Sequence, residues 1–339
     1  MEYYEAICIL EENESLNFLN YYNIKSDSKY MSKQKKDIAL IVIQKNGVLF
    51  EHFPEWSIEK KFDYHDWRKK NNYPEIINFI SNNHRENYTM ESSQLKKIDI
   101  DDLLKFFSQK IAKINKNFLL NIDFEYCIND EFKCVELPYS KKSIVLLGRK
   151  KKYFSVEEAI YFFHEIGHAI YNSFKYYNNF YVPIELDEFF AHLFEFYFYY
   201  TYYSKINVSN ELLIYKKILN KKLTNNIIYT DFACQVCQNK FSEEEKQNLL
   251  DTIALKNGID IDLIEKTSWK EIPEIFSYPF YSASYIFIEY FIVSFISRNN
   301  MEIDFSKFEN NILSTMYNLS KNWKNINWTE ELNKLFSID

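Results

Sequence analysis

The sequence has few of the residues that end helices and shape turns. Among 339 residues there are only 4 glycines and 6 prolines. Because Gly and Pro mark most turns, their scarcity disfavours a fold of many short strands and favours long helices. Hydrophobic residues make up 47% of the chain, enough to build the core of one large domain or of two smaller ones. We therefore expect a mainly α-helical (α+β) protein.

An excess of positive charge and a long apolar stretch are also missing. The formal net charge is −7, which argues against nucleic acid as a partner, because phosphate binding needs clustered Lys and Arg. The N-terminal residues lack the basic segment of a signal peptide. The apolar stretch from Tyr285 to Ile296 is interrupted by Glu289 and is too short to span a bilayer. We expect a soluble, cytoplasmic protein that does not act on membranes.

Cysteine is scarce as well, and the total of 5 is odd, so no disulfide framework is implied. Cys234 and Cys237 form a C-x-x-C, which is typical of half a zinc site or of a redox pair. Cys127 and Cys134 do not complete a familiar four-thiolate spacing with them. We favour free, buried cysteines with a structural role.

Strands are predicted in two places. Two β-rich runs within Asp37 to Phe53 flank Asn46-Gly47, a pair typical of a hairpin turn. Three short apolar runs between residues 121 and 150 predict a small antiparallel sheet. We expect a smaller N-terminal region of unknown role, residues 1–95, containing the β-hairpin. A mostly helical domain, residues 96–339, contains the sheet.

One stretch carries recognisable chemistry, the H-E-x-x-H from His164 to His168. At positions i and i+4 of a helix, two imidazoles lie on one face and can reach the same zinc ion. Glu165, beside the first His, can then act as a general base on a water at the metal. Ser155 and Glu158 form a capping box, which predicts that this helix begins near residue 156.

Gly167, inside this motif, is one of the few glycines. A glycine in a helix interior costs about 1 kcal/mol relative to alanine. We therefore expect another backbone to pack closely against the helix at this point.

A second helix is predicted from near Glu185. On it Glu188, His192 and Glu195 form one polar stripe. Catalytic zinc sites use three protein ligands and keep one position open. We take Glu188 as the third ligand, after His164 and His168, and keep Glu185, Glu195 and His192 as alternatives.

The stretches HEIGHA and ELDEFFAHLFE resemble the thimet oligopeptidase and oligoendopeptidase F family of gluzincins. In that family a ligating Glu is followed by another Glu seven residues later, the separation of Glu188 and Glu195. The sheet before Gly148 and the downstream Tyr281 and Tyr285 also resemble the family. The resemblance covers about half the chain and implies a helical zincin-type domain, with the sheet beside the metal helix.

The chain also departs from the family pattern. Tyr171 stands where the family often has a further His, and no His follows His192. The interval from His168 to Glu188 is shorter than is usual for the family.

The resemblance implies one zinc ion per chain, a peptide substrate, and roles for the residues around the metal. Glu165 is the general base. Tyr281 or Tyr285 donates a hydrogen bond to the oxyanion. Glu195 orients a ligand imidazole, and His192 supports the same site. We predict a zinc metallopeptidase, of oligopeptidase or endopeptidase type, that hydrolyses short or unfolded peptides.

Two alternatives stay open. One is a catalytically idle protein that binds zinc and peptides in the same place, which would hold zinc without cleaving any peptide. The other is a helical interaction protein in which the motif is fortuitous, which would hold no stoichiometric zinc.

Overall fold

The computed structural model of the chain describes residues 3–21, 24, 33–45, 97–129, 131–178, 184–203, 209–256, 269–271, 282, 285, 286, 288–290, 292, 293, 305–322, 334 and 335. Statements about structure concern these residues.

Long helices and a few short strands make up the described part of the chain, as the shortage of Gly and Pro predicts. The α-helices are α1 (Tyr3–Tyr21), α2 (Lys33–Lys45), α5 (Ile100–Asn115), α6 (Val156–Asn178), α7 (Ile184–Tyr203), α8 (Ser209–Gln238), α9 (Glu243–Lys256) and α12 (Phe305–Asn322). The strands are β1 (Ile98–Asp99), β2 (Ile122–Glu125), β3 (Phe132–Leu137), β4 (Lys142–Leu147) and β5 (Tyr153–Phe154). The short helices η3 (Phe118–Asn121) and η6 (Trp269–Glu271) complete the elements. The mainly helical fold class is therefore confirmed.

The chain divides into two compact units, and each is discontinuous in sequence. The first comprises Met1–Leu49, Leu95–Leu212 and Met301–Asp339, and the second comprises Phe50–Gln94 and Leu213–Asn300. In the second unit, Ile228 and Phe232 of α8 share a buried cluster with Leu250 of α9. The predicted division at residue 95 stays a prediction.

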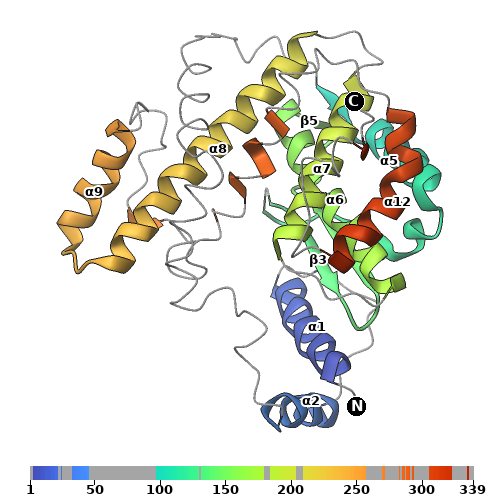
Figure 1. Cartoon of the computed structure of the whole chain (residues 1–339). Helices are drawn as coiled ribbons and strands as arrows, with labels where there is room; N and C mark the ends of the chain where they lie inside the picture. Colours follow the sequence, from blue (N-terminus) through green and yellow to red (C-terminus); the bar gives the residue numbers. More distant parts are fainter. Residues whose placement is uncertain are drawn as a thin grey trace. The chain divides into compact units, whose positions relative to one another are not determined.

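Helices α6 and α7 form the centre of the first unit and lie side by side (Figure 1). The predicted capping box starts α6: Glu158 N donates to Ser155 Oγ over 3.2 Å, and Ser155 N donates to a Glu158 oxygen over 2.8 Å. The expectation for Gly167 is also confirmed. A Cβ at this position would lie 2.6 Å from the backbone oxygen of Ala191 in α7, so only glycine lets the two helices approach this closely.

The small sheet lies against α6 and has the order β2-β4-β3. β3 and β4 pair antiparallel, as predicted, but β2 pairs parallel to β4, so the prediction of a wholly antiparallel sheet was wrong. β4 is the strand with the most buried residues, and the central position buries both of its faces. Ile144 packs with Leu19 of α1, whereas Ser143 faces Asn172 of α6.

The predicted N-terminal hairpin is contradicted. Its first arm lies within α2, which is helical from Lys33 to Lys45, and Asn46-Gly47 lies outside the described residues. A short apolar run such as ALIVI suits a strand or a packed helix equally, and periodicity alone does not distinguish the two. Packing against α1, with Ala39 fully buried, accompanies the helical form.

Among the described helices, none combines the length and the apolar character that crossing a membrane requires. The predicted cytoplasmic localisation stays a prediction.

Candidate metal centre

Two adjacent helices bring three potential ligand atoms together. α6 supplies His164 and His168, and α7 supplies Glu188. The two Nε2 atoms are 3.2 Å apart, and Glu188 Oε2 lies 3.4 Å from His164 Nε2 and 3.5 Å from His168 Nε2. The backbones of α6 and α7 approach each other closely at Gly167, and this brings the side chains of the two helices near enough for these separations.

This triangle fits a zinc ion. Zinc bonds to His nitrogen and to carboxylate oxygen are about 2.0–2.2 Å long. In a tetrahedral arrangement, ligand atoms at that distance are about 3.3–3.6 Å from one another. Two of the observed separations, 3.4 and 3.5 Å, lie in this range, and the third, 3.2 Å, lies just below it. Two imidazoles and one carboxylate are also a donor set typical of a catalytic zinc site.

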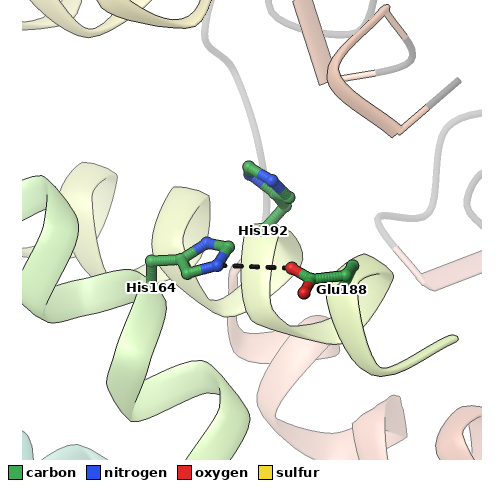
Figure 2. Close-up of side chains that lie close together, drawn as sticks. All are labelled: His164, Glu188 and His192. Carbon is green, nitrogen blue, oxygen red and sulfur yellow. Dashed lines mark ion pairs between the residues drawn. The ribbon is translucent and has the colours of Figure 1, made fainter. Parts of the chain in front are cut away.

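His192 is a further candidate ligand. One nitrogen or oxygen atom each from His164, Glu188 and His192 lies within 4.8 Å of the others, and Figure 2 shows how these three side chains face one another. The His192 ring is 4.5 Å from the His164 ring, centroid to centroid, and its Nδ1 lies 3.4 Å from Glu195 Oε2. The set with His168 has the shorter separations, so it fits zinc more closely.

Carboxylates hold both imidazoles of the H-E-x-x-H in place. His164 Nδ1 lies 3.0 Å from Glu195 Oε2, and His168 Nδ1 lies 3.1 Å from Asp187 Oδ1. A carboxylate that accepts from Nδ1–H leaves the Nε2 lone pair free to bind a metal. Glu195 was predicted for this role, whereas Asp187 was missed. Its position directly before Glu188, in the acidic start of the predicted second helix, was the available signal.

The same contacts change the acidity of these groups. Burial alone would lower the pKa of His164, but hydrogen bonds to Glu188 and Glu195 more than offset this effect and raise it from 6.5 to about 9. The pKa of His168 is raised in the same way by Glu188 and Asp187, against the effect of burial. Burial opposes ionisation of Glu188, yet the two imidazoles hold its pKa well below the usual value. The cluster therefore favours a positive charge between its carboxylates.

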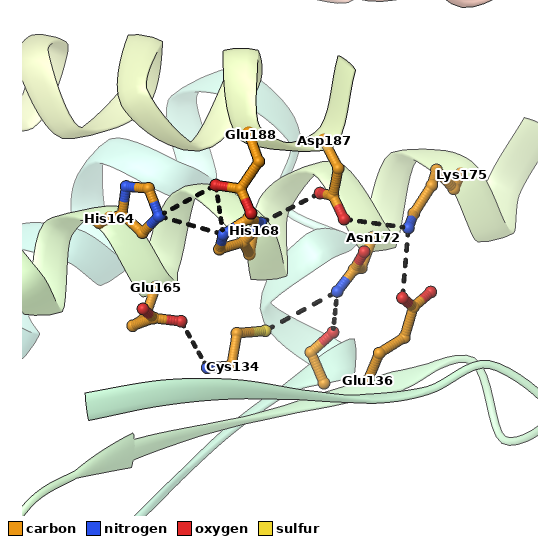
Figure 3. A network of polar contacts seen from close by, with 10 residues as sticks. Cys134, Glu136, His164, Glu165, His168, Asn172, Lys175, Asp187 and Glu188 are labelled. Carbon is orange, nitrogen blue, oxygen red and sulfur yellow. Dashed lines mark hydrogen bonds and ion pairs between the residues drawn. The ribbon is translucent and has the colours of Figure 1, made fainter. Parts of the chain in front are cut away.

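The sheet holds Glu165 beside this centre. The backbone N–H of Cys134 in β3 donates to Glu165 Oε2 over 2.6 Å (Figure 3). β3 is an edge strand of its sheet, and this amide points away from β4 because it donates to α6 instead. One carboxylate oxygen of Glu165 is thus fixed by the edge strand.

The other predicted residues fall elsewhere. Tyr281 lies outside the described residues, as do the side chains of Glu185, Cys234 and Cys237. Tyr285 is helical and half-buried in the second unit, and its role stays a prediction.

Tyr171 packs instead of facing the ligands. Its ring stacks on Phe190 with centroids 4.6 Å apart, and its hydroxyl lies 2.9 Å from Ser320 Oγ of α12. The free, buried state expected for cysteine holds for Cys127, Cys8 is buried, and Cys134 is free although only half-buried.

Comparison of the sequence with protein-family models gives no match, and comparison with curated proteins gives none either. Solved structures do match. A candidate oligoendopeptidase F, determined by X-ray crystallography, matches with a TM-score of 0.55 and 12% identity, over 89% of this chain and 60% of that chain. A second candidate oligoendopeptidase F, from Bacillus anthracis, matches with a TM-score of 0.51 and 13% identity, over 94% of this chain and 61% of that chain.

The present chain thus spans about three fifths of the length of both matched structures. At 12% and 13% sequence identity, the likeness shows a shared fold and nothing further. The likeness to oligoendopeptidase F that was noted from a few residues is confirmed at that level: the chain shares its fold with two candidate oligoendopeptidase F proteins.

Proposed function

We propose that this protein is a zinc-dependent peptidase that cleaves short or unfolded peptides. One observation carries the proposal: the triangle of His164, His168 and Glu188 atoms, with separations that suit zinc, lies beside Glu165, whose carboxylate is held through Oε2 by the β3 backbone. The fold shared with two candidate oligoendopeptidases supports the same conclusion.

His164, His168 and Glu188 would hold the metal, with one position left for water. Zinc bound there would supply a Lewis acid and lower the pKa of a water toward neutrality. Asp187 and Glu195 keep the two imidazoles in the tautomer that presents Nε2. Glu165 accepts the proton of the attacking water on one carboxylate oxygen while β3 holds the other, and it then passes the proton to the leaving amine.

The position of β3 at the edge of its sheet favours an extended peptide as the substrate. An extended peptide can add to an exposed sheet edge through its backbone. β3 is an edge strand, and it contacts Glu165 directly. A peptide lying along β3 would place its backbone next to the base, and a short or unfolded peptide adopts that form without loss of tertiary structure.

The test is cleavage of a mixed peptide library with and without a chelator, followed by Glu165→Gln. We expect about one zinc per chain in both proteins. In Glu165→Gln we expect a loss of cleavage of about 10²–10⁴-fold, the range for a general base. Glu157→Gln, at an exposed position in the first turn of α6, is the matched control and should keep full activity.

The outcomes separate the alternatives. Full activity in Glu165→Gln would contradict the proposal. Stoichiometric zinc with no cleavage of any peptide by the wild type would favour an idle zinc- and peptide-binding protein. Less than about 0.1 zinc per chain after dialysis would favour a fortuitous motif.

A further inference from the structure

Lys175 lies next to the candidate metal centre, although the proposed function uses no lysine as a zinc ligand or as a general base. The side chain of Lys175 in α6 is only 11% exposed. Its Nζ lies 3.3 Å from Glu136 Oε2 of β3 and 3.7 Å from Asp187 Oδ2 of α7 (Figure 3). One ammonium group therefore links three elements: the helix of the H-E-x-x-H, the helix of Glu188 and the edge strand.

The contacts of Asp187 are divided between its two oxygens. Oδ1 lies 3.1 Å from His168 Nδ1, and Oδ2 lies 3.7 Å from Lys175 Nζ. A carboxylate with a separate partner on each oxygen has a fixed plane, so the imidazole that it contacts has a fixed direction. Without Lys175, Asp187 could rotate and His168 would lose part of its orientation.

The contact of Lys175 with Glu136 leads toward Glu165, the proposed general base. Glu136 is two residues after Cys134 in β3, and its side chain lies on the same face of the strand, toward α6. The backbone N–H of Cys134 donates to Glu165. The Glu136–Lys175 pair therefore fixes β3 to α6 close to the point where β3 holds Glu165.

We propose that Lys175 is a positioning residue of the metal centre, which acts through Asp187 on His168 and through Glu136 on the edge strand. The proposal rests on the proposed function for its metal. It assigns to Lys175 a part in metal affinity that a structural ion pair does not have.

The chain offers a closely matched control, Lys110 of α5. Its side chain is 12% exposed, and its Nζ lies 2.7 Å from Glu309 Oε1. It also lies over a tyrosine ring, 5.2 Å from the centroid of Tyr197, as Lys175 lies 5.8 Å from that of Tyr171. Substituting either lysine removes a largely buried cation from its carboxylate partners, but only Lys175 has a partner, Asp187, that contacts a predicted zinc ligand.

The first experiment compares Lys175→Met, Lys175→Arg and Lys110→Met by competition with a zinc chelator. Loss of the partner of a ligand imidazole typically weakens metal affinity about 10–100-fold. Lys175 contacts that partner and not the imidazole itself, so we expect a loss near the lower end of this range for Lys175→Met, a change of less than about twofold for Lys110→Met, and substantial recovery in Lys175→Arg. Urea unfolding of the zinc-free proteins shows whether both Met variants fold. Should Lys175→Met not fold, Lys175→Gln takes its place.

The second experiment tests the route through Asp187. If Lys175 acts on His168 through Asp187, then Lys175→Met should weaken zinc binding little further once Asp187→Asn is present. Fully additive losses would overturn this route, and an unchanged zinc affinity in Lys175→Met would overturn the proposal as a whole.

These readouts separate the present proposal from the proposed function. Both experiments measure zinc affinity and need no substrate. A wild type that binds zinc, shows the expected losses and cleaves no peptide would contradict only the function. A wild type that cleaves peptides, with no loss in Lys175→Met, would contradict only the role of Lys175. A wild type that binds no zinc would contradict both.

Discussion

Two clusters of charged side chains in the first unit differ in the cations that neutralise their carboxylates. In one, Glu309 of α12 accepts a hydrogen bond from Lys110 over 2.7 Å, lies 3.8 Å from Lys113 and accepts another bond from the Tyr197 hydroxyl. Burial would raise the pKa of Glu309, but Lys110 and Tyr197 more than offset this effect and lower it. The Glu309 cluster is thus neutralised by its own lysines.

The candidate metal centre has different positively charged partners. Glu188 and Glu195 face imidazoles, which are positively charged only when protonated. In the described part of the chain, Lys175 contributes a fixed positive charge at this centre through its contact with Asp187. The Glu309 cluster thus contains its own cations, whereas the raised pKa values of His164 and His168 indicate that the candidate metal centre favours an added positive charge, and its side chains could bind a metal ion.

The largest expected effect is on zinc affinity, which should depend on Glu188 and not on Glu309. Glu188→Gln should weaken zinc binding by more than about 100-fold, because a ligand is lost rather than its outer partner. Glu309→Gln should leave zinc affinity unchanged and lower the free energy of unfolding by about 1–3 kcal/mol, as expected for loss of hydrogen bonds to a charged group. Chelator competition and urea unfolding measure these quantities. Weakened zinc binding in Glu309→Gln would remove the distinction.

The second prediction concerns pH. Since the pKa of His164 is raised to about 9 in the absence of metal, zinc must displace a proton below that pH. Apparent zinc affinity should therefore rise with pH up to about 9, by about tenfold per pH unit for each proton displaced. The sign for folding is opposite. The raised pKa stabilises the zinc-free protein fully below pH 6.5, and this contribution is lost as pH rises through about 9.

Zinc titrations between pH 6.5 and 9.5 in the wild type and in Glu309→Gln provide the measurement. Among the described residues, Glu309 contacts Lys110, Lys113 and Tyr197 and no imidazole, so both proteins should give the same profile. A zinc affinity that does not change between pH 7 and 9 would contradict the prediction that zinc displaces a proton from His164.

The smallest expected effect concerns the helix spacing on which the metal centre depends. In Gly167→Ala the new Cβ would lie 2.6 Å from the Ala191 backbone oxygen and 2.7 Å from its Cα. Overpacking costs about 1–3 kcal/mol, against a gain in helix propensity of about 1 kcal/mol. We expect a net loss of stability in urea unfolding. Adding Ala191→Gly should not restore the stability of Gly167→Ala, because the new Cβ overlaps with backbone atoms of residue 191. Restored stability would show that the Ala191 methyl group causes the overlap.

Much of the metal helix was predictable because its signals are local. A capping box needs only Ser155 and Glu158, and the facing of His164 and His168 needs only helical periodicity. The need for glycine at position 167 also followed from its cost in a helix. Glu188 was selected by spacing along the next helix, and the structure places it within 3.5 Å of both imidazoles.

Other features depended on contacts between distant segments. The run ALIVI in α2 suits a strand locally, and it is helical where it packs against α1. The parallel pairing of β2 with β4 depends on which strand takes the central place. Asp187 and Lys175 have no motif of their own, because their roles arise only where α6, α7 and β3 meet.

By itself the sequence determined that the chain is mainly helical and that one capped helix presents two imidazoles and a carboxylate. Both follow from interactions within a few residues of the backbone. Tertiary structure alone decided that Glu188 completes a triangle of zinc-ligand size, that β3 holds Glu165, and that Lys175 connects them. Those distances depend on how closely α7 and the sheet approach α6, and that approach is set by packing at Gly167 and in the core.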